Sequence, residues 1–291
     1  MASLLDYESA KQLSAEVMRK CRMCPVACGA KRLEGKRGAC RVADKIIVSS
    51  AFLHFGEEPV LVGGTGSGTI FFSGCNLHCV YCQNYDISQR VSGQAVSEDE
   101  LVTLMLRLER SGARNINFVS PSHYALPILC ATIKARSLGL RVPIVWNSGG
   151  YDSIEVLKAL EGWIEIYMPD AKYADERTAF RLSRIQNYPK IMKANLKEMQ
   201  RQVGDLVIER GIATRGVLVR HLVLPHNLSG AKEIIDFLAD EVSPNLYLNL
   251  MAQYRPCYKA HYIPELRNYI DISEYRRLLE YARKRGLRLA R

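Results

Sequence analysis

Short apolar runs that alternate with helical stretches constrain the fold of this chain more than any other feature of its sequence. After residue 60 the runs are GTIFFSG, NINFVSP, VPIVWN, WIEIYMPD, GVLVRHLVLP and LYLNLMAQY. Helices are expected near residues 123–138, 153–161, 174–203, 229–240 and 272–286. Strands that are apolar on both faces and separated by helices are typical of a parallel sheet with right-handed crossovers. Six such units predict an α/β fold, specifically an incomplete (β/α)6 TIM-like barrel.

The chain divides into two expected parts, a small cysteine-rich amino-terminal extension over residues 1–60 and the partial barrel with its carboxyl-terminal helix over residues 61–291. Its 291 residues, 48% of them hydrophobic, are enough to bury a sizeable core. Within the barrel, Ser97 and Glu100 form a predicted capping box at the start of a helix. No apolar run approaches the roughly 18 residues of a membrane span, and the first residues lack the layout of a signal peptide. The sequence therefore predicts a cytoplasmic protein with no membrane partner.

Three cysteines follow the first of these runs with the spacing C-x3-C-x2-C, at Cys75, Cys79 and Cys82. In a β/α barrel the loops at the carboxyl ends of the strands carry the chemistry, and this loop lies at such an end. A structural zinc site needs four ligands, and His78, between two of the cysteines, is poorly placed to be the fourth. Three thiolates around a 4Fe-4S cluster instead leave one iron open to a small molecule. The loop is therefore predicted to bind a 4Fe-4S cluster.

The same loop resembles that of the radical S-adenosylmethionine (SAM) superfamily, in which an aromatic residue precedes the third cysteine, here Tyr81. The resemblance implies that the open iron binds SAM and that one electron, supplied by an external donor, cleaves it to a 5'-deoxyadenosyl radical. That radical abstracts hydrogen from a substrate. The resemblance places Tyr81 on the adenine side of the cofactor.

A wider resemblance covers about residues 20 to 256. The words FLHFGEEP, GSGTIFFSGCN, YCQNYDISQ and CRMCPVACGAKRLEGKRGAC are similar to an uncharacterised branch of these enzymes that is itself similar to pyruvate formate-lyase activating enzyme. By this resemblance the segment YMPDAKY, at the end of one strand, contains residues that hold SAM, and the strands before and after it offer further contacts. The implied cofactor-binding residues are Asp170, Lys172, Arg220, His221 and Asn147, the last in a turn with Ser148 and Gly149.

Two departures from the activating enzymes affect what the resemblance implies. Their Gly-Gly-Glu motif, which receives the methionine amine, is replaced here by SPSH. Ser120, Ser122 and His123 are therefore candidates for binding this amine by position only. The ferredoxin-like insertion that some glycyl-radical activators carry after the cluster loop is absent, because QNYDISQR continues directly. A glycyl-radical-type protein, a small metabolite and RNA therefore all stay open as substrates.

The amino-terminal extension contains a second cysteine group, Cys21, Cys24, Cys28 and Cys40, spaced C-x2-C-x3-C-x11-C. Four thiolates suit a closed site. Either structural zinc or an auxiliary iron–sulfur cluster fits this donor set, and the spacing does not separate them.

The net charge of +10 has a local origin, because residues 19–41 contain eight Lys or Arg and the single acid Glu34. Such a patch leaves nucleic acid, an acidic protein or a phosphorylated substrate open as partners. It supports an alternative function, a zinc-dependent nucleic-acid-binding protein in which both cysteine groups are structural. His54, Glu57 and Glu58 in LHFGEEP fit either the lining of a substrate pocket or a solvated loop.

Overall fold

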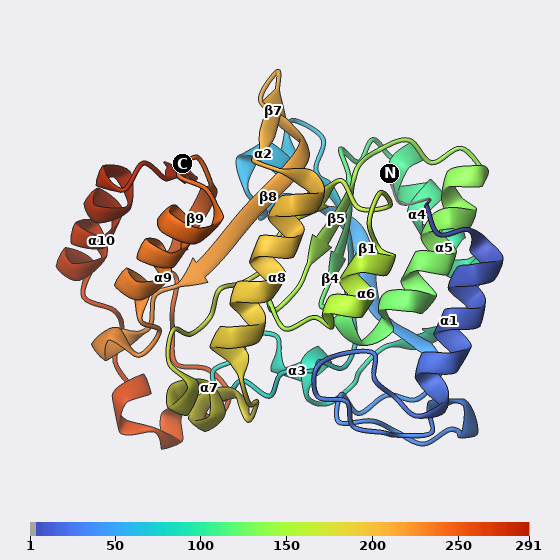
Figure 1. Ribbon diagram of the computed structural model, residues 1–291, viewed down its shortest axis with the longest axis horizontal. Helices are drawn as coiled ribbons and strands as arrows, with labels where there is room; N and C mark the ends of the chain where they lie inside the picture. Colours follow the sequence, from blue (N-terminus) through green and yellow to red (C-terminus); the bar gives the residue numbers. More distant parts are fainter. Residues whose placement is uncertain (1–3, 291) are drawn as a thin grey trace.

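One continuous, mostly parallel sheet organises the computed structural model, which describes residues 4–290 (Figure 1). The strand order is β10-β9-β8-β6-β5-β4-β2-β1-β3, and β7 pairs with β8 beside this path. The strands are β1 (Ile46–His54), β2 (Ser67–Phe72), β3 (Gln94–Val96), β4 (Ile116–Val119), β5 (Ile144–Asn147), β6 (Ile166–Tyr167), β7 (Val207–Glu209), β8 (Ile212–Leu222), β9 (Tyr247–Met251) and β10 (Arg288–Leu289).

The predicted α/β class is confirmed by how these strands pair. The six predicted runs are β2, β4, β5, β6, β8 and β9, and each is parallel to its neighbour in that order. The order ends at β3 on one side and at β10 on the other, and no pairing joins those two strands in the described chain. This open, curved arrangement is consistent with a partial TIM-like barrel.

Helices cover the outer face of the sheet: Figure 1 shows α5, α6 and α8 in front of the strands, and α1 and α4 pack against α5. The helices are α1 (Tyr7–Arg19), α2 (Pro59–Val62), α3 (Tyr85–Ser88), α4 (Glu98–Arg110), α5 (Ala125–Ser137), α6 (Ile154–Ala159), α7 (Glu176–Ser183), α8 (Tyr188–Val203), α9 (Ala231–Phe237) and α10 (Ile272–Lys284). The capping box of Ser97 and Glu100 is confirmed at the start of α4.

One helical prediction is corrected by the structure. Residues 174–203 form two helices, α7 and α8, rather than one. Arg184 and Asn187 both take left-handed backbone conformations between them, and Pro189 lies in the first turn of α8. Proline fits that position because its missing N–H has no partner to lose at the start of a helix.

Strand β1 runs antiparallel to β2 and carries the chain back to the end of the sheet where the parallel strands begin. The sheet thus continues across residue 60, where the sequence places a domain boundary that stays a prediction. The following residues 55–62, which include α2 and which we call the floor segment, then enter the concave side of the sheet. There Leu61 packs in a buried cluster with Val145, Ile166 and Leu218. Figure 1 shows α2 at the opposite end of the sheet from α3, so the floor segment closes the end remote from the cysteine loop.

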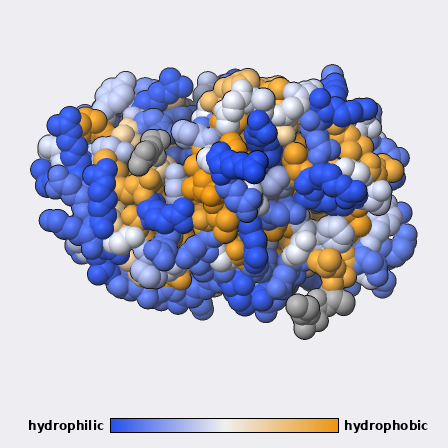
Figure 2. Space-filling view, turned by 90° about the horizontal axis from the view of Figure 1, so that it is seen from above, coloured by the Kyte–Doolittle hydropathy of each residue, from blue (hydrophilic) through white to orange (hydrophobic). Residues whose placement is uncertain are grey.

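Figure 2 looks onto the face that carries α2 and β7. Hydrophilic residues cover most of this face and divide the hydrophobic ones into separate patches. Across residues 4–290, no helix is both long enough and apolar enough to span a bilayer.

A glycine in β8 provides a test of this packing. Gly216 has a φ of +118°, and a Cβ built there would lie 2.4 Å from the Asp205 carbonyl oxygen. We expect Gly216→Ala to lower the free energy of unfolding by about 2 kcal/mol or more, because both strain and overlap oppose the methyl group. Gly64→Ala is the matched control, since a Cβ at Gly64 meets nothing within 4 Å. Urea unfolding of the two variants should differ clearly, and equal midpoints would contradict the packing of β8.

Candidate active site

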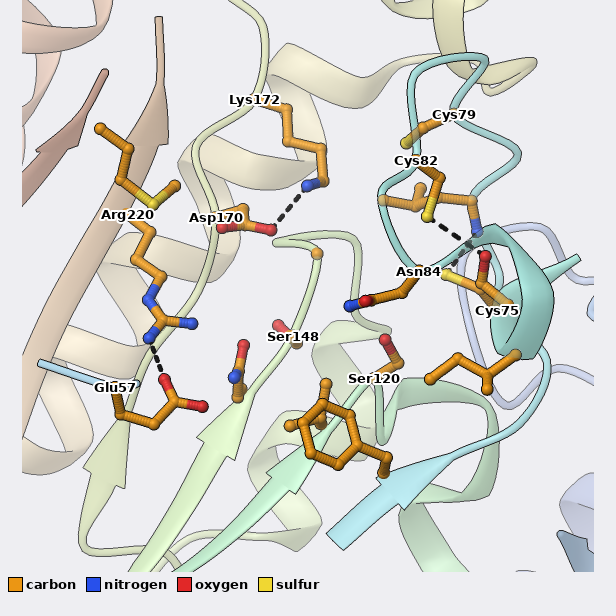
Figure 3. Close-up of a pocket in the computed structure, with 18 of the residues that line it drawn as sticks. Glu57, Cys75, Cys79, Cys82, Asn84, Ser120, Ser148, Asp170, Lys172 and Arg220 are labelled. Atoms are coloured by element: carbon orange, nitrogen blue, oxygen red, sulfur yellow. Dashed lines mark hydrogen bonds and ion pairs between the residues drawn. The ribbon is translucent and has the colours of Figure 1, made fainter. Parts of the chain in front are cut away.

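A cavity of about 530 Å³ lies at the carboxyl ends of the parallel strands, on the concave side of the sheet (Figure 3). Its wall is built by the ends of β2, β4, β5, β6, β8 and β9 and by the loops that follow them. Eight of the predicted site residues line it: Cys75, Cys79, Cys82, Ser120, Asn147, Asp170, Lys172 and Arg220. Ser148 and Gly149 line it as well. The fold thus brings most of the candidate cofactor residues into one space.

Backbone hydrogen bonds from distant segments hold the cysteine loop (residues 73–84) in place. The amides of His78 and Val80 donate to the carbonyls of Ser183 and Leu182, at 3.0 and 2.8 Å. On the other side the amide of Lys259 donates to the Val80 carbonyl at 2.8 Å. The loop is therefore fixed between the end of α7 and the segment that follows β9.

The three thiols of this loop are largely shielded from water. Each sulfur has a close polar neighbour: Leu77 N at 3.4 Å from Cys75, Ser183 Oγ at 3.0 Å from Cys79 and Ser88 Oγ at 3.2 Å from Cys82. Burial raises the pKa of Cys75 and of Cys82 above their ordinary values. Because a metal ligand must be a thiolate, binding at this loop has to release protons.

An acid–base pair at the end of β6 faces the cysteine loop across the cavity. Lys172 Nζ lies 2.6 Å from Asp170 Oδ2, and both side chains are mostly buried. Burial by itself would lower the pKa of Lys172, but the carboxylate of Asp170 raises it well above its usual range. Lys172 is therefore a fixed cation beside the cysteine loop.

Arg220, from β8, contacts two carboxylates of the floor segment. Its Nε lies 2.7 Å from Glu58 Oε1 and its Nη2 lies 2.5 Å from Glu58 Oε2, while Nη2 also pairs with Glu57. Asn249 donates to Glu58 Oε1 at 2.7 Å. Burial opposes both charges, yet Arg220 holds the pKa of Glu58 below its ordinary value and Glu58 raises that of Arg220. The guanidinium is thus neutralised at the base of the cavity, and the three side chains together carry one net negative charge.

Tyr81 is absent from the residues that line the cavity, and its side chain joins a buried group of tyrosines. Its hydroxyl donates to that of Tyr173 at 2.6 Å, and its ring contacts Tyr254. The Tyr173 hydroxyl lies 2.6 Å from Ser183 Oγ, which in turn contacts the Cys79 sulfur. Tyr81 is therefore linked to a predicted cluster ligand through two hydroxyl groups, and its adenine contact stays a prediction.

Ser122 and His221 also lie behind the cavity wall. Ser122 hydrogen-bonds the buried carboxyl of Asp152, whose pKa is raised by that burial. His221 donates from Nδ1 to the Ala171 carbonyl and accepts at Nε2 from the Ser229 hydroxyl at 3.1 Å. Ala171 separates Asp170 from Lys172, so His221 positions the backbone between two cavity residues. Direct cofactor contact by Ser122 or His221 stays a prediction.

Some other polar residues of the cavity were indicated only ambiguously by the sequence, and others were not indicated at all. His54, Glu57 and Glu58, for which the sequence left two interpretations, line the cavity. Asn249 was missed, although it is the one polar residue in the apolar run LYLNLM. Gln89 was also missed, and it lines the cavity while its side chain donates to the Leu77 carbonyl at 3.2 Å.

The amino-terminal cysteine group packs directly behind the cysteine loop. Cys21, Cys24 and Cys40 are buried and Cys28 is exposed. Burial raises the pKa of Cys24 to about 12. A Cβ added to Gly74, the residue before Cys75, would lie 2.6 Å from the Cys40 carbonyl oxygen. The two cysteine groups are thus in contact through their backbones.

Neither group forms a ready-made site for a single ion. Across residues 4–290, no three or more His, Cys, Asp or Glu side chains are placed so that they would hold one metal ion. Metal binding at both cysteine groups stays a prediction.

The three-cysteine loop and the charged cavity lie at the carboxyl ends of the parallel strands, which is where β/α-barrel enzymes carry their chemistry. A model of the radical SAM superfamily matches residues 69–238, more than half of the chain. The chain therefore belongs to the radical SAM superfamily and is a radical SAM enzyme.

Relatives within curated proteins extend over nearly the whole chain. An uncharacterized protein of Methanocaldococcus jannaschii is 34% identical over 99% of this chain and 80% of its own length. The pyruvate formate-lyase-activating enzyme of Clostridium pasteurianum is 26% identical over 79% of this chain and 87% of its own length. The resemblance to the activating enzyme is thus confirmed as a relationship.

Solved structures show the same fold. A radical SAM methyltransferase from Sphaerobacter thermophilus has a TM-score of 0.53 at 14% identity, covering 77% of this chain and 65% of that protein. The [FeFe]-hydrogenase maturase HydG has a TM-score of 0.51 at 12% identity, covering 75% of this chain and 49% of that protein. The chain spans less than two thirds of the length of each of these structures, and the likeness concerns the fold.

The buried histidine behind the wall should make stability depend on pH. Burial lowers the pKa of His221 to about 4 in the folded protein, so the unfolded chain binds a proton there first as the pH falls below 6.5. Folding stability is therefore lost between pH 6.5 and 4, by about 1.4 kcal/mol per pH unit for this group. We expect His221→Gln to reduce the loss between pH 7 and pH 5 by about 2 kcal/mol, as measured by urea unfolding at each pH.

The exposed His261 provides the control. The variant His261→Gln should keep the wild-type dependence on pH. A His221→Gln variant with the same dependence as the wild type would show that His221 is not buried as a neutral group.

Proposed function

We propose that this radical SAM enzyme holds a 4Fe-4S cluster through Cys75, Cys79 and Cys82 and uses it to abstract hydrogen from a substrate. The observation that carries the proposal is that these three thiols share one cavity with the Asp170–Lys172 pair. Three thiol donors on one loop fit a cubane cluster with one open iron. When bound, the cluster supplies one electron that breaks the sulfur–C5' bond of SAM, giving methionine and a 5'-deoxyadenosyl radical that takes a hydrogen atom from the substrate.

The residues of this chain would bind and orient the cofactor. Asp170 and Lys172 are proposed to hold the ribose or the carboxylate of SAM, because they present a carboxylate and a fixed cation beside the cysteine loop. Ser120 and Asn147, on neighbouring strand ends of the same wall, supply hydroxyl and amide groups for its remaining polar atoms. Arg220 is already neutralised by the floor segment, so we assign it to the base of the cavity rather than to the cofactor.

A protein substrate is proposed for the hydrogen abstraction. The relationship to an activating enzyme supports a backbone glycine of a glycyl-radical-type protein as the hydrogen donor. An external electron donor is required, because each cleavage consumes one electron. The four amino-terminal cysteines are proposed to hold zinc or a second iron–sulfur cluster, since four thiols suit a closed site.

The alternative function, zinc-dependent nucleic-acid binding, has one observation in its favour, the basic stretch over residues 19–41. Seven of the eight Lys and Arg residues in that stretch are exposed, and Arg32 is buried. Nucleic-acid binding nevertheless leaves the three-cysteine cavity without a role. We therefore favour the radical enzyme.

The first test removes the proposed cluster ligands together. We expect anaerobically purified wild type to be brown, to absorb near roughly 400 nm and to make 5'-deoxyadenosine when dithionite and SAM are added. The triple variant Cys75→Ala, Cys79→Ala, Cys82→Ala should lose this product entirely. Iron, sulfide and zinc analysis of both proteins accompanies the assay. A wild type that contains only zinc and makes no 5'-deoxyadenosine would refute the proposal.

A second test concerns SAM binding. Asp170→Asn removes the carboxylate beside Lys172, and we expect the affinity of the cluster-loaded protein for SAM to fall about tenfold or more. The control is Asp236→Asn, which breaks a similar Lys–Asp pair, Lys232 Nζ to Asp236 Oδ2 at 2.7 Å, on the surface. Isothermal titration calorimetry should show no loss of SAM affinity in the control. Equal SAM affinity in both variants would show that Asp170 does not contribute to SAM binding.

A further inference from the structure

Arg32 is a fully buried cation in the amino-terminal segment, which is otherwise rich in exposed Lys and Arg. Its Nε donates to the Ala43 carbonyl at 2.7 Å, and its Nη1 donates to the His123 carbonyl at 2.6 Å. Its guanidinium also stacks over the ring of Tyr124, 5.6 Å from the centroid. The side chain is thus held firmly by neutral groups.

These groups leave its positive charge without a carboxylate. Among residues 4–290, no Asp or Glu forms an ion pair with Arg32, and its Nη2 has no hydrogen-bond partner. Burying an unpaired ion in a protein costs several kcal/mol, so a buried charge is normally paired with an opposite one. One group able to become an anion is Cys21, whose sulfur lies 4.0 Å from Arg32 Nη1.

The amino-terminal cysteines can supply that negative charge when they bind a metal. Four thiolates around Zn²⁺ or around an oxidised 4Fe-4S cluster leave a net negative charge on the centre. Two of the thiols lie close to Gly38: a Cβ added there would lie 3.0 Å from Cys28 Sγ and 3.5 Å from Cys40 Sγ. A side chain at Gly38 would therefore contact two of the four donors.

The same arginine connects this group to the cysteine loop of the cavity. The carbonyl that Arg32 contacts belongs to His123, and the imidazole Nε2 of His123 donates to the Ser73 carbonyl at 2.9 Å. Ser73 and Gly74 lead directly into Cys75, and Gly74 packs on the Cys40 backbone. The amino-terminal cysteines and Arg32 therefore form the support behind the first predicted cluster ligand.

We propose that Cys21, Cys24, Cys28 and Cys40 hold an anionic metal–thiolate centre, and that Arg32 is its buried counter-ion and links it through His123 to the cysteine loop. The inference rests on the amino-terminal metal site of the proposed function and is independent of SAM chemistry. Zinc and an iron–sulfur cluster share the thiolate chemistry that Arg32 would balance. Metal analysis separates the two.

The test uses the full chain with Cys75, Cys79 and Cys82 replaced by Ala, so that only the amino-terminal site can hold metal. We expect this protein, purified anaerobically, to contain about one zinc or about four iron per chain. In that background Arg32→Met should lose metal to EDTA at least tenfold faster, because a neighbour that supports metal ligands typically contributes about 10–100-fold in affinity. Arg32→Lys should retain metal better than Arg32→Met, since it keeps the charge.

Arg37→Met is the control, because Arg37 is exposed in the same segment. It should release metal at the rate of its parent. Protection of the four cysteines from alkylation, mapped by peptide, gives a second readout of whether metal is bound at these residues. If Arg32→Met does not fold, the metal content of a folded Arg32→Lys variant tests the counter-ion role instead. Complete loss of metal from Arg32→Lys would refute that role.

Two other results would overturn the inference. One is the absence of zinc and iron from the parent protein, with all four cysteines open to alkylation. The other is an Arg32→Met variant that folds and releases metal at the parent rate. Either result would leave the 5'-deoxyadenosine assay of the intact protein unaffected as a test of the proposed function.

Discussion

The pairing of Arg220 with Glu57 and Glu58 is the interaction on which the shape of the cavity depends. A guanidinium on a central strand of the sheet is costly to bury without partners, and the floor segment provides two carboxylates inside the curve of the sheet. Strand β1, which runs antiparallel to β2 and β3, delivers residues 55–62 to the end where the parallel strands begin. The floor segment then sets the depth of the space beneath the cysteine loop.

Much of this architecture could be predicted from local patterns. The six apolar runs gave the parallel strands because strands covered on both faces are apolar throughout. The spacing of Cys75, Cys79 and Cys82 indicated the cysteine loop, and the resemblance to the activating enzymes indicated Asp170 and Lys172. All five side chains line one cavity, because the carboxyl ends of parallel strands meet at one edge of a sheet.

What the sequence did not provide depends on contacts between distant residues. Arg220 and His221 are adjacent, so on a strand they point to opposite faces, and only one of them can line the cavity. The partners of Arg220 lie more than 160 positions earlier in the chain. Tyr81 likewise turned toward Tyr173, a contact that no local pattern describes. The break between α7 and α8 rests on two left-handed residues, Arg184 and Asn187, of which only Asn favours that conformation.

The charges of the cavity and of the whole chain have opposite signs. Glu57, Glu58 and Asp170 outnumber Arg220 and Lys172 around the cavity, whereas the chain as a whole carries +10. A small cation approaching from solution is thus repelled at long range and attracted only once it is within a Debye length, about 8 Å at physiological ionic strength. Added salt screens the long-range repulsion first. The association rate of a positively charged ligand with this enzyme should therefore rise with ionic strength. An encounter that is steered by electrostatic attraction shows the opposite trend.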